Sequence, residues 1–228
     1  MSSNIFVRYI FSTTIMLGVA MLFSACDGMF EDIYDNNKTL QPQEIVKDGE
    51  FFVDATSYTA WQYLDLSADN ITFVSSDIEN STTETGVPSQ WTIALHRYDV
   101  KTNNCTAAET NFSSISELQI ALNANSKLLA QYTFEPDIFS TNKIIIDLSH
   151  MIDEGYLIYQ EGCYNEVVSR WLNVDISVMP PIYTPSHKVY ILHTAADEYY
   201  ALYLVSFVDE NAVKGYLTIK YQLLSVSQ

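Results

Sequence analysis

Short runs of β-branched and aromatic residues recur along most of the chain beyond Ile45, and apolar and polar positions tend to alternate within them. Alternation with a period of two is typical of half-buried β-strands. The clearest runs are Phe51–Ala55, Thr59–Leu66, Ile71–Ser75, Trp91–Val100, Lys143–Leu148 and Trp171–Ile176. The pattern therefore predicts an all-β domain of antiparallel sheets.

The C-terminal segment 187–224 contains three long apolar runs separated by TAADE and DENAVKG. These breaks contain the Asp, Asn and Gly that hairpin turns favour, so we expect an antiparallel meander with long hairpins. One window predicts a helix, from Ser114 to Ala130, where apolar residues recur at helical spacing behind a serine cap. At most one short helix is therefore expected.

Residues 1–25 have the features of a secretory signal peptide, with Arg8 as the one basic side chain before an apolar run that reaches Phe23. The segment ends in LFSAC, in which small residues before Cys26 resemble a bacterial lipobox. We predict that cleavage leaves Cys26 as the lipidated first residue of an outer-membrane lipoprotein. The alternatives are ordinary signal cleavage or a retained membrane helix, and the run is short for a span of about 20 residues.

Residues 26–44 are polar and acidic and predict a flexible tether, which leaves 45–228 as a single domain. Asp27, Glu31, Asp32 and Asp35 follow the cysteine directly and resemble signals that send lipoproteins to the cell surface. A cell-surface location is therefore expected. A merely solvated linker is the alternative.

Charge and cysteine content narrow the possible partners. The chain has 11 Lys and Arg against 28 Asp and Glu, a net charge of −17, and loss of Arg8 with the signal peptide makes it −18. Because phosphate binding requires positive charge, nucleic acid is excluded as a partner. Cys105 and Cys163 remain in a compartment that permits disulfides, and they are a candidate pair.

Enzyme signatures are absent from the sequence. It contains no P-loop, no G-x-G-x-x-G, no H-E-x-x-H, no C-x-x-C and no G-x-S-x-G pattern. The four histidines lack metal-ligand spacing, and we expect His96 and His193 to be structural. The sequence therefore predicts a binding protein and not an enzyme.

Two segments repeat one pattern. IIIDLSHM (144–151) and LNVDISVM (172–179) each place Asp, an apolar residue, Ser and Met after a strand. A third segment, WQYLDLSAD (61–69), shares the Asp and Ser but has Asp69 in place of the methionine. The Asp and Ser therefore indicate turns at strand ends, because both side chains can bond nearby backbone groups.

The segments WTIALHRYDVKTNN (91–104) and WLNVDIS-x-MPP-x-Y-x-P-S (171–186), together with the lipoprotein N-terminus, resemble the HmuY-like family of haem-binding outer-membrane lipoproteins. The resemblance implies an all-β fold and a haemophore. Such a protein takes haem from host haem-carrier proteins and passes it to a TonB-dependent outer-membrane receptor. In this family two loop side chains hold the haem iron, histidines in some members and methionines in others.

The paired contexts of Met151 and Met179 favour these two thioethers as the axial ligands, and Pro180 and Pro181 restrict the chain after Met179. Two apolar side chains that only cap the core are the alternative interpretation. His150 and His187 are the reserve ligands. Tyr183, with Tyr156 and Tyr159, is a candidate wall of the haem pocket, and Lys143 and Lys188 are candidates to meet the haem propionates.

A surface glycan-binding or adhesion lipoprotein is the competing function. It requires exposed aromatic platforms. Trp91 and Trp171 lie in apolar strand patterns that predict burial, so Trp61 is the remaining candidate platform.

Overall fold

The computed structural model describes residues 44–47, 49–67, 73–79, 83–178 and 180–226. The chain divides into two units, Met1–Asp35 and Asn36–Gln228, and every described residue belongs to the second unit. The predicted signal peptide, Cys26, the tether up to residue 43 and Met179 lie outside the described residues.

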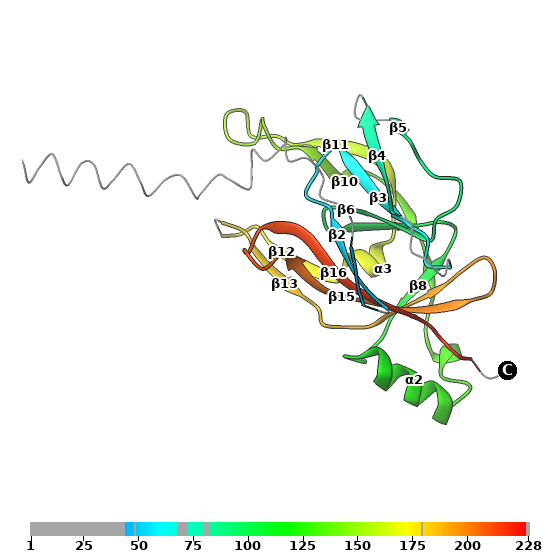
Figure 1. The fold of residues 1–228 in the computed structure, drawn as a ribbon. Coiled ribbons are helices and arrows are strands. Elements are labelled where there is room, and N and C mark those ends of the chain that lie inside the picture. Colours follow the sequence, from blue (N-terminus) through cyan, green and yellow to red (C-terminus); the bar gives the residue numbers. More distant parts are fainter. Residues whose placement is uncertain (1–43, 48, 68–72, 80–82, 179, 227–228) are drawn as a thin grey trace, which may run out of the picture. The chain divides into compact units, whose positions relative to one another are not determined.

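The larger of two main sheets has seven strands, all paired antiparallel (Figure 1). In spatial order they are β1 (Glu44–Lys47), β2 (Glu50–Asp54), β16 (Lys214–Leu223), β15 (Tyr199–Val208), β14 (Tyr190–His193), β8 (Thr106–Glu109) and β9 (Glu135–Pro136). The last three long strands in the sequence, β14, β15 and β16, are neighbours, which confirms the predicted C-terminal meander.

The second sheet has five antiparallel strands. They are β5 (Thr83–Thr85), β4 (Phe73–Glu79), β3 (Ala60–Leu64), β6 (Ile93–His96) and β7 (Asp99–Thr102). Two further pairs form separate two-stranded sheets: β10 (Ile138–Asp147) with β11 (Ile158–Tyr164), and β12 (Leu172–Asp175) with β13 (Ile182–Pro185). The all-β antiparallel class is therefore confirmed.

The two main sheets share one hydrophobic core. Phe51 on β2, Leu202 on β15 and Leu217 on β16 are fully buried in one cluster with Leu64 on β3 and Leu95 on β6. Because both sheets contribute to this cluster, they pack face to face as a sandwich. A smaller cluster covers the other side of β3, where Trp61 and Tyr63 pack against Ile144 and Ile146 of β10.

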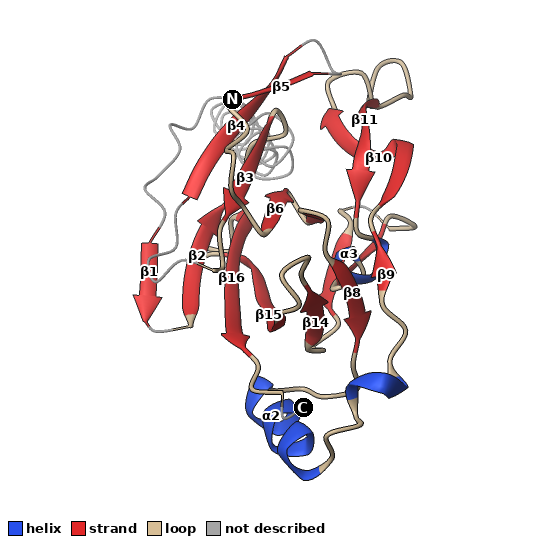
Figure 2. Cartoon of the chain, turned by 90° about the vertical axis from the view of Figure 1, so that its right-hand side faces the viewer, coloured by secondary structure: helices blue, strands red, loops and turns tan. Residues whose placement is uncertain are grey.

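The predicted helix is present but shorter than expected. α2 spans Ile115–Ala124, and its cap Ser114 accepts a hydrogen bond from the Glu117 backbone at 3.2 Å. The helix ends at Ala124 with Asn125 as its C-cap, and a separate 3-10 turn, η1 (Leu129–Gln131), follows. Leu118 and Leu122 pack against the outer face of the seven-stranded sheet. The helix itself lies below the strand ends in Figure 2. A four-residue helix, α3 (Glu166–Ser169), was not expected.

The segment Trp91–Val100, which was predicted as one strand, is instead a tight hairpin of β6 and β7. His96 pairs with Asp99, so Arg97 and Tyr98 form the turn. Arg97 adopts a positive φ of 52°. Two-residue hairpin turns favour Gly or Asn at such a position, and the sequence offers neither. The turn was therefore invisible to the sequence pattern.

The structure decides two other expectations, one about Trp61 and one about the two cysteines. Trp61 was the candidate glycan platform, but only 1% of it is exposed, so this prediction is wrong. Its indole Nε1 donates to Gln160 Oε1 at 2.8 Å, which ties β3 to β11. Cys105 and Cys163 are both free cysteines, the first buried and the second exposed, so the candidate disulfide is not formed.

Candidate functional site

The two separate hairpins carry the repeated sequence pattern at their tips. The 148–157 loop joins β10 to β11, and the 176–181 loop joins β12 to β13. Both loops point to the left in Figure 1, on the same side as the β15–β16 turn. The fold therefore presents both tips in one direction.

The Asp and Ser of the repeated pattern form the predicted turns. Asp147 Oδ1 accepts from the Ser149 backbone at 2.7 Å, and Asp175 Oδ1 accepts from the Ser177 backbone at 2.9 Å. These hydrogen bonds lower the pKa of both carboxyls, through the Ser149 backbone for Asp147 and chiefly through the Ser177 hydroxyl for Asp175. Asp65 makes the same turn with Ser67. The shared residues are thus structural, as expected, and they leave the methionines as the distinguishing feature of the two tips.

The β10–β11 tip contains Met151 and His150. Met151 is half-buried, and its backbone N–H donates to Leu148 O at 3.0 Å. The His150 ring stacks on Tyr156 with centroids 4.7 Å apart and an interplanar angle of 9°, and Nδ1 lies 3.2 Å from Glu154 Oε1. Both candidate ligands therefore sit on this tip. Tyr159 is half-buried on β11, opposite Ile145 of β10.

His187 lies at the other end of the β12–β13 hairpin. Leu172 pairs with Pro185, and the Ser186 backbone donates to Trp171 O at 2.6 Å, so His187 follows the base of the hairpin. Three residue steps along a strand cover about 10 Å. The structure thus separates His187 from the hairpin tip, and Lys188 beside it is paired with Glu109.

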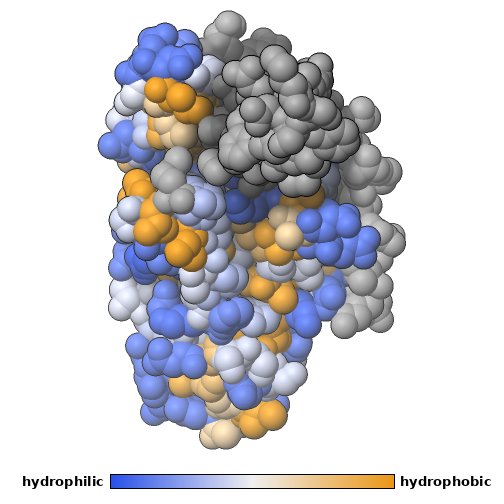
Figure 3. All heavy atoms as spheres, turned by 90° about the vertical axis from the view of Figure 1, so that its left-hand side faces the viewer, coloured by the Kyte–Doolittle hydropathy of each residue, from blue (hydrophilic) through white to orange (hydrophobic). Residues whose placement is uncertain are grey.

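Large apolar side chains are exposed at these tips. The exposed fractions are 52% for Ile152, 78% for Ile176, 42% for Val178 and 54% for Ile182. Figure 3 views this side of the molecule and shows several separate apolar patches on it. Isolated exposed apolar residues are ordinary, but a set that gathers on loops facing one direction is typical of a binding surface.

Three aromatic rings meet beside the β12–β13 hairpin, and we call them the aromatic floor: Tyr98 of the β6–β7 turn, Tyr183 of β13 and Phe207 of β15. The Phe207 ring centroid lies 5.7 Å from that of Tyr98 and 5.4 Å from that of Tyr183, and the two tyrosines are 6.4 Å apart. Tyr98 and Tyr183 are half-buried, whereas Phe207 is buried. Tyr183 was expected to be a wall residue. Tyr98 and Phe207 were not predicted, because only the folded chain brings them next to Tyr183.

Each ring of the aromatic floor has a cation beside it. Lys143 Nζ lies 5.5 Å from the Tyr98 centroid, Arg97 Cζ lies 5.6 Å from that of Phe207, and Lys214 Nζ lies 5.0 Å from that of Tyr183. Lys143 also pairs with the buried carboxylate of Asp99 at 3.2 Å. Burial raises the pKa of Asp99 to about 6, and Lys143 partly offsets this effect.

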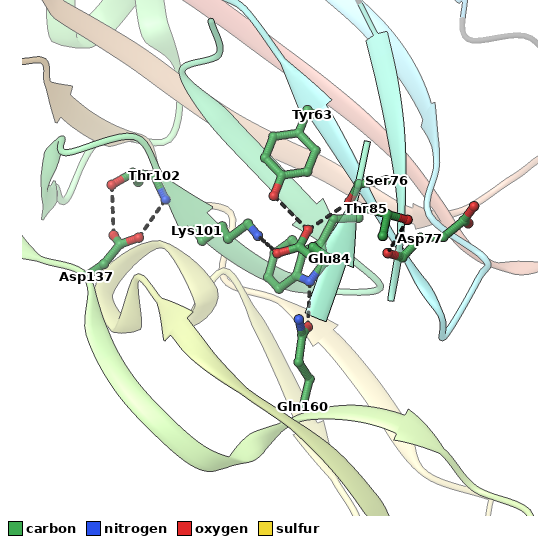
Figure 4. Close-up of polar contacts among 10 residues, drawn as sticks. Tyr63, Ser76, Asp77, Glu84, Thr85, Lys101, Thr102, Asp137 and Gln160 are labelled. Atoms are coloured by element: carbon green, nitrogen blue, oxygen red, sulfur yellow. Dashed lines mark hydrogen bonds and ion pairs between the residues drawn. The ribbon is translucent and has the colours of Figure 1, made fainter. Parts of the chain in front are cut away.

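A second polar cluster, drawn in Figure 4, is internal. Glu84 accepts from Tyr63 and Ser76, both at 2.7 Å, and pairs with Lys101, whose Nζ lies 4.1 Å from the Trp61 ring centroid. Burial alone would raise the pKa of Glu84, but Lys101 and the hydrogen bonds hold it below its ordinary value. Because the donors and acceptors satisfy one another, this cluster stabilises the fold.

The other candidate sites are a polar hollow and the two histidines His96 and His193. A polar hollow of 310 Å³ lies between Asp65, Trp91 and Tyr200, away from the hairpin tips. His96 is buried with Nε2 2.8 Å from Tyr58 O, and His193 stacks on Tyr199, so both are structural. Among the described residues, no group of three or more His, Cys, Asp or Glu could hold a metal ion. No helix in the described part of the chain has the length and apolar character needed to span a membrane.

The fold and this site together define a class of protein: an all-β sandwich that presents two separate hairpins beside an aromatic surface. The sequence profile of the HmuY protein family matches residues 57–221. The chain therefore belongs to the HmuY family.

Solved structures support this assignment. A candidate lipoprotein from Bacteroides fragilis is 40% identical, with 82% of this chain and 96% of that chain covered and a TM-score of 0.69. A candidate HmuY-like haem-binding protein from Bacteroides vulgatus is 37% identical, with 78% and 92% covered and a TM-score of 0.66. An apo HmuY analogue from Tannerella forsythia is 18% identical, with 82% and 100% covered and a TM-score of 0.60, and shares the fold. A comparison with curated protein sequences found no match.

Proposed function

We propose that this protein binds haem between the tips of the β10–β11 and β12–β13 hairpins. The observation that carries the proposal is the aromatic floor of Tyr98, Tyr183 and Phe207 beside the β12–β13 hairpin, together with the apolar side chains that both hairpin tips expose. A porphyrin is flat and largely apolar, so it requires such surfaces. The relative from B. vulgatus, described as haem-binding, supports the same ligand.

Met151 and Met179 are the proposed axial ligands of the haem iron. Haem supplies an iron with two free axial positions, and thioether sulfur is a soft, neutral ligand for it. Met151 is half-buried on the β10–β11 tip, and Met179 belongs to the loop that follows the matching Asp175 turn. His150 is the nearest alternative ligand, because it is adjacent to Met151. His187 is a weaker candidate, because it follows the base of its hairpin.

The proposed biological role is that of a haemophore. Residues 1–25 would be removed, Cys26 would be lipidated, and residues 26–44 would tether the 45–228 domain to the outer membrane, facing the cell surface. The domain would take haem from host carrier proteins and pass it to a TonB-dependent receptor. The lipobox-like LFSAC sequence and the relative from B. fragilis, described as a candidate lipoprotein, support the anchor.

The three tryptophans do not favour the competing glycan-binding role. Trp61 and Trp171 are each 1% exposed, and Trp91 is half-buried with its ring edge-on to Tyr63. An exposed tryptophan platform is therefore lacking, and we propose no second function.

A haemin titration tests the proposal. The chain without residues 1–25, carrying Cys26→Ala to prevent lipidation, is titrated in the oxidised state and after reduction with dithionite. We expect saturation at one haem per chain, with sharper low-spin bands and tighter binding in the reduced state, because thioether ligands favour ferrous iron. Absence of saturable binding in both states, by protein that circular dichroism shows to be folded, would disprove it.

A further inference from the structure

The cations around the aromatic floor are unusual for this chain. It has 11 Lys and Arg against 28 Asp and Glu, yet each of the three floor rings has one of these cations within 6 Å of its centroid. A positive cluster on an acidic protein focuses attraction for anions at that place.

Within the described part of the chain, no carboxylate pairs with Arg97. Its side chain is buried, with 5% exposed, and Nη1 donates to Thr56 O at 2.6 Å. The guanidinium lies between the rings of Tyr58 and Phe207, 4.3 and 5.6 Å from their centroids, and its Nε has no hydrogen-bond partner among the described residues. A buried cation without a counterion is costly. Its charge therefore lies beside Phe207 of the aromatic floor.

The Lys143 side chain also lies beside the aromatic floor. The register of β10 and β11 shifts between Ser140 and Ile144, so Lys143 lies in an irregularity of β10. Such bulges redirect side chains out of the regular alternation. Lys143 reaches Asp99 and the Tyr98 ring, but 35% of its side chain stays exposed. An ammonium has three donors, so Lys143 can pair with Asp99 and still bind a second carboxylate.

We infer that Lys143 binds a carboxylate of a tetrapyrrole, with the buried charge of Arg97 adding to the positive potential at the aromatic floor. The inference rests on the proposed haem function and deepens it. It assigns the carboxylate edge of the ligand to the aromatic floor and its metal centre to the hairpin tips. The protein then selects porphyrins with free carboxylates over their neutral esters.

The test compares metal-free protoporphyrin IX with its dimethyl ester, both titrated by fluorescence into the Cys26→Ala chain without residues 1–25. Without iron, the axial ligands contribute nothing. We expect the ester to bind at least about tenfold more weakly, since a hydrogen bond to a charged group contributes that much or more. Added salt should weaken binding of the free acid but not of the ester. Equal affinity of the two compounds would overturn the inference.

Lysine variants locate the effect. Lys143→Gln should lower affinity for protoporphyrin IX about tenfold, and Lys143→Arg should retain it. Lys188→Gln is the matched control, because Lys188 pairs with Glu109 beyond the base of the β12–β13 hairpin. Unchanged affinity in Lys143→Gln, or an equal loss in Lys188→Gln, would overturn the inference. Circular dichroism verifies folding.

The two proposals fail in different ways. If haemin binds but protoporphyrin IX does not, or binds no better than its ester, the haem function stands and the carboxylate site is wrong. If neither haemin nor protoporphyrin IX binds, the haem function itself fails.

Discussion

His96 and Asp99 face each other as register partners across the β6–β7 hairpin, and burial shifts their pKa values in opposite directions. Burial lowers the pKa of His96 from 6.5 to about 4, aided by the charges of Arg97 and Lys101. Burial raises the pKa of Asp99 from 3.8 to about 6, against the effect of Lys143. At pH 5 both side chains are therefore neutral in the folded protein.

The two residues have opposing effects on stability in acid. Between pH 6.5 and 4 the unfolded chain protonates His96 and the folded protein does not, so acidification lowers the free energy of unfolding. Between pH 6 and 3.8 the folded protein holds a proton on Asp99 that the unfolded chain lacks. Acidification in this range therefore raises the free energy of unfolding. The contributions of His96 and Asp99 to the free energy of unfolding therefore nearly cancel.

Single variants should expose each contribution. Relative to the unmodified protein, His96→Gln should gain about 2 kcal/mol of unfolding free energy between pH 6.5 and 4.5, and Asp99→Asn should lose about as much. Gln retains a donor for Tyr58 O, and Asn retains the shape of Asp. Urea unfolding at several pH values measures the differences. Two variants that follow the same pH trend would contradict the assignment.

The ligand set is tested by four substitutions. Met151→Ala and Met179→Ala should each weaken ferrous haem binding and change the visible spectrum, whereas His150→Ala and His187→Ala should leave both nearly intact. Ferrous coordination should persist at mildly acidic pH, because a thioether has no proton to gain where an imidazole protonates near a pKa of about 6.5. If the histidine variants abolish binding and the methionine variants do not, histidines are the ligands.

The Glu84 cluster should be important for stability. Lys101 and Glu84 are largely buried, with side chains 11% and 15% exposed. Glu84→Gln removes the charge that Lys101 requires, so we expect a loss of about 3–5 kcal/mol in urea unfolding. Glu166→Gln is the control, because its pair with Arg170 is exposed and should contribute less than about 1 kcal/mol. Similar losses in both variants would show that burial of an ion pair does not determine how much stability is lost when the pair is broken.

Lipidation is tested by metabolic labelling with a fatty acid. The protein should be labelled, and Cys26→Ala should abolish the label, because Cys26 is the cysteine that the lipobox-like sequence places at the cleavage site. Cys163→Ala is the control, since its thiol is exposed but lies outside the lipobox-like sequence. Label that persists in Cys26→Ala would refute the anchor. Protease treatment of intact cells should release the domain if it faces outward.

Local chemistry was predictable from the sequence. The Asp–Ser turns, the start of α2 at Ser114 and the C-terminal meander all depend on residues close together in the chain. Burial of Trp61 was not predictable, because β3 is buried on both faces and therefore lacks alternation. Tyr98 and Phe207 of the aromatic floor were also missed, since they come from segments far from Tyr183 in the chain. Arg97 adopts its positive φ in a turn enclosed by Thr56, Tyr58 and Phe207, which no local pattern reports.

The separation of the β12–β13 hairpin from both main sheets has a mechanical consequence. Among the described strands, β12 and β13 pair only with each other, while Leu172, Val174 and Tyr183 pack against the core of the sandwich. Opening of this hairpin therefore breaks side-chain packing but no ladder of the main sheets, and it requires less free energy than unfolding of the domain. If the protein carries haem as proposed, it can exchange its cargo while the sandwich stays folded. Amide hydrogen exchange should accordingly be fast in β12 and β13 and slow in β15 and β16.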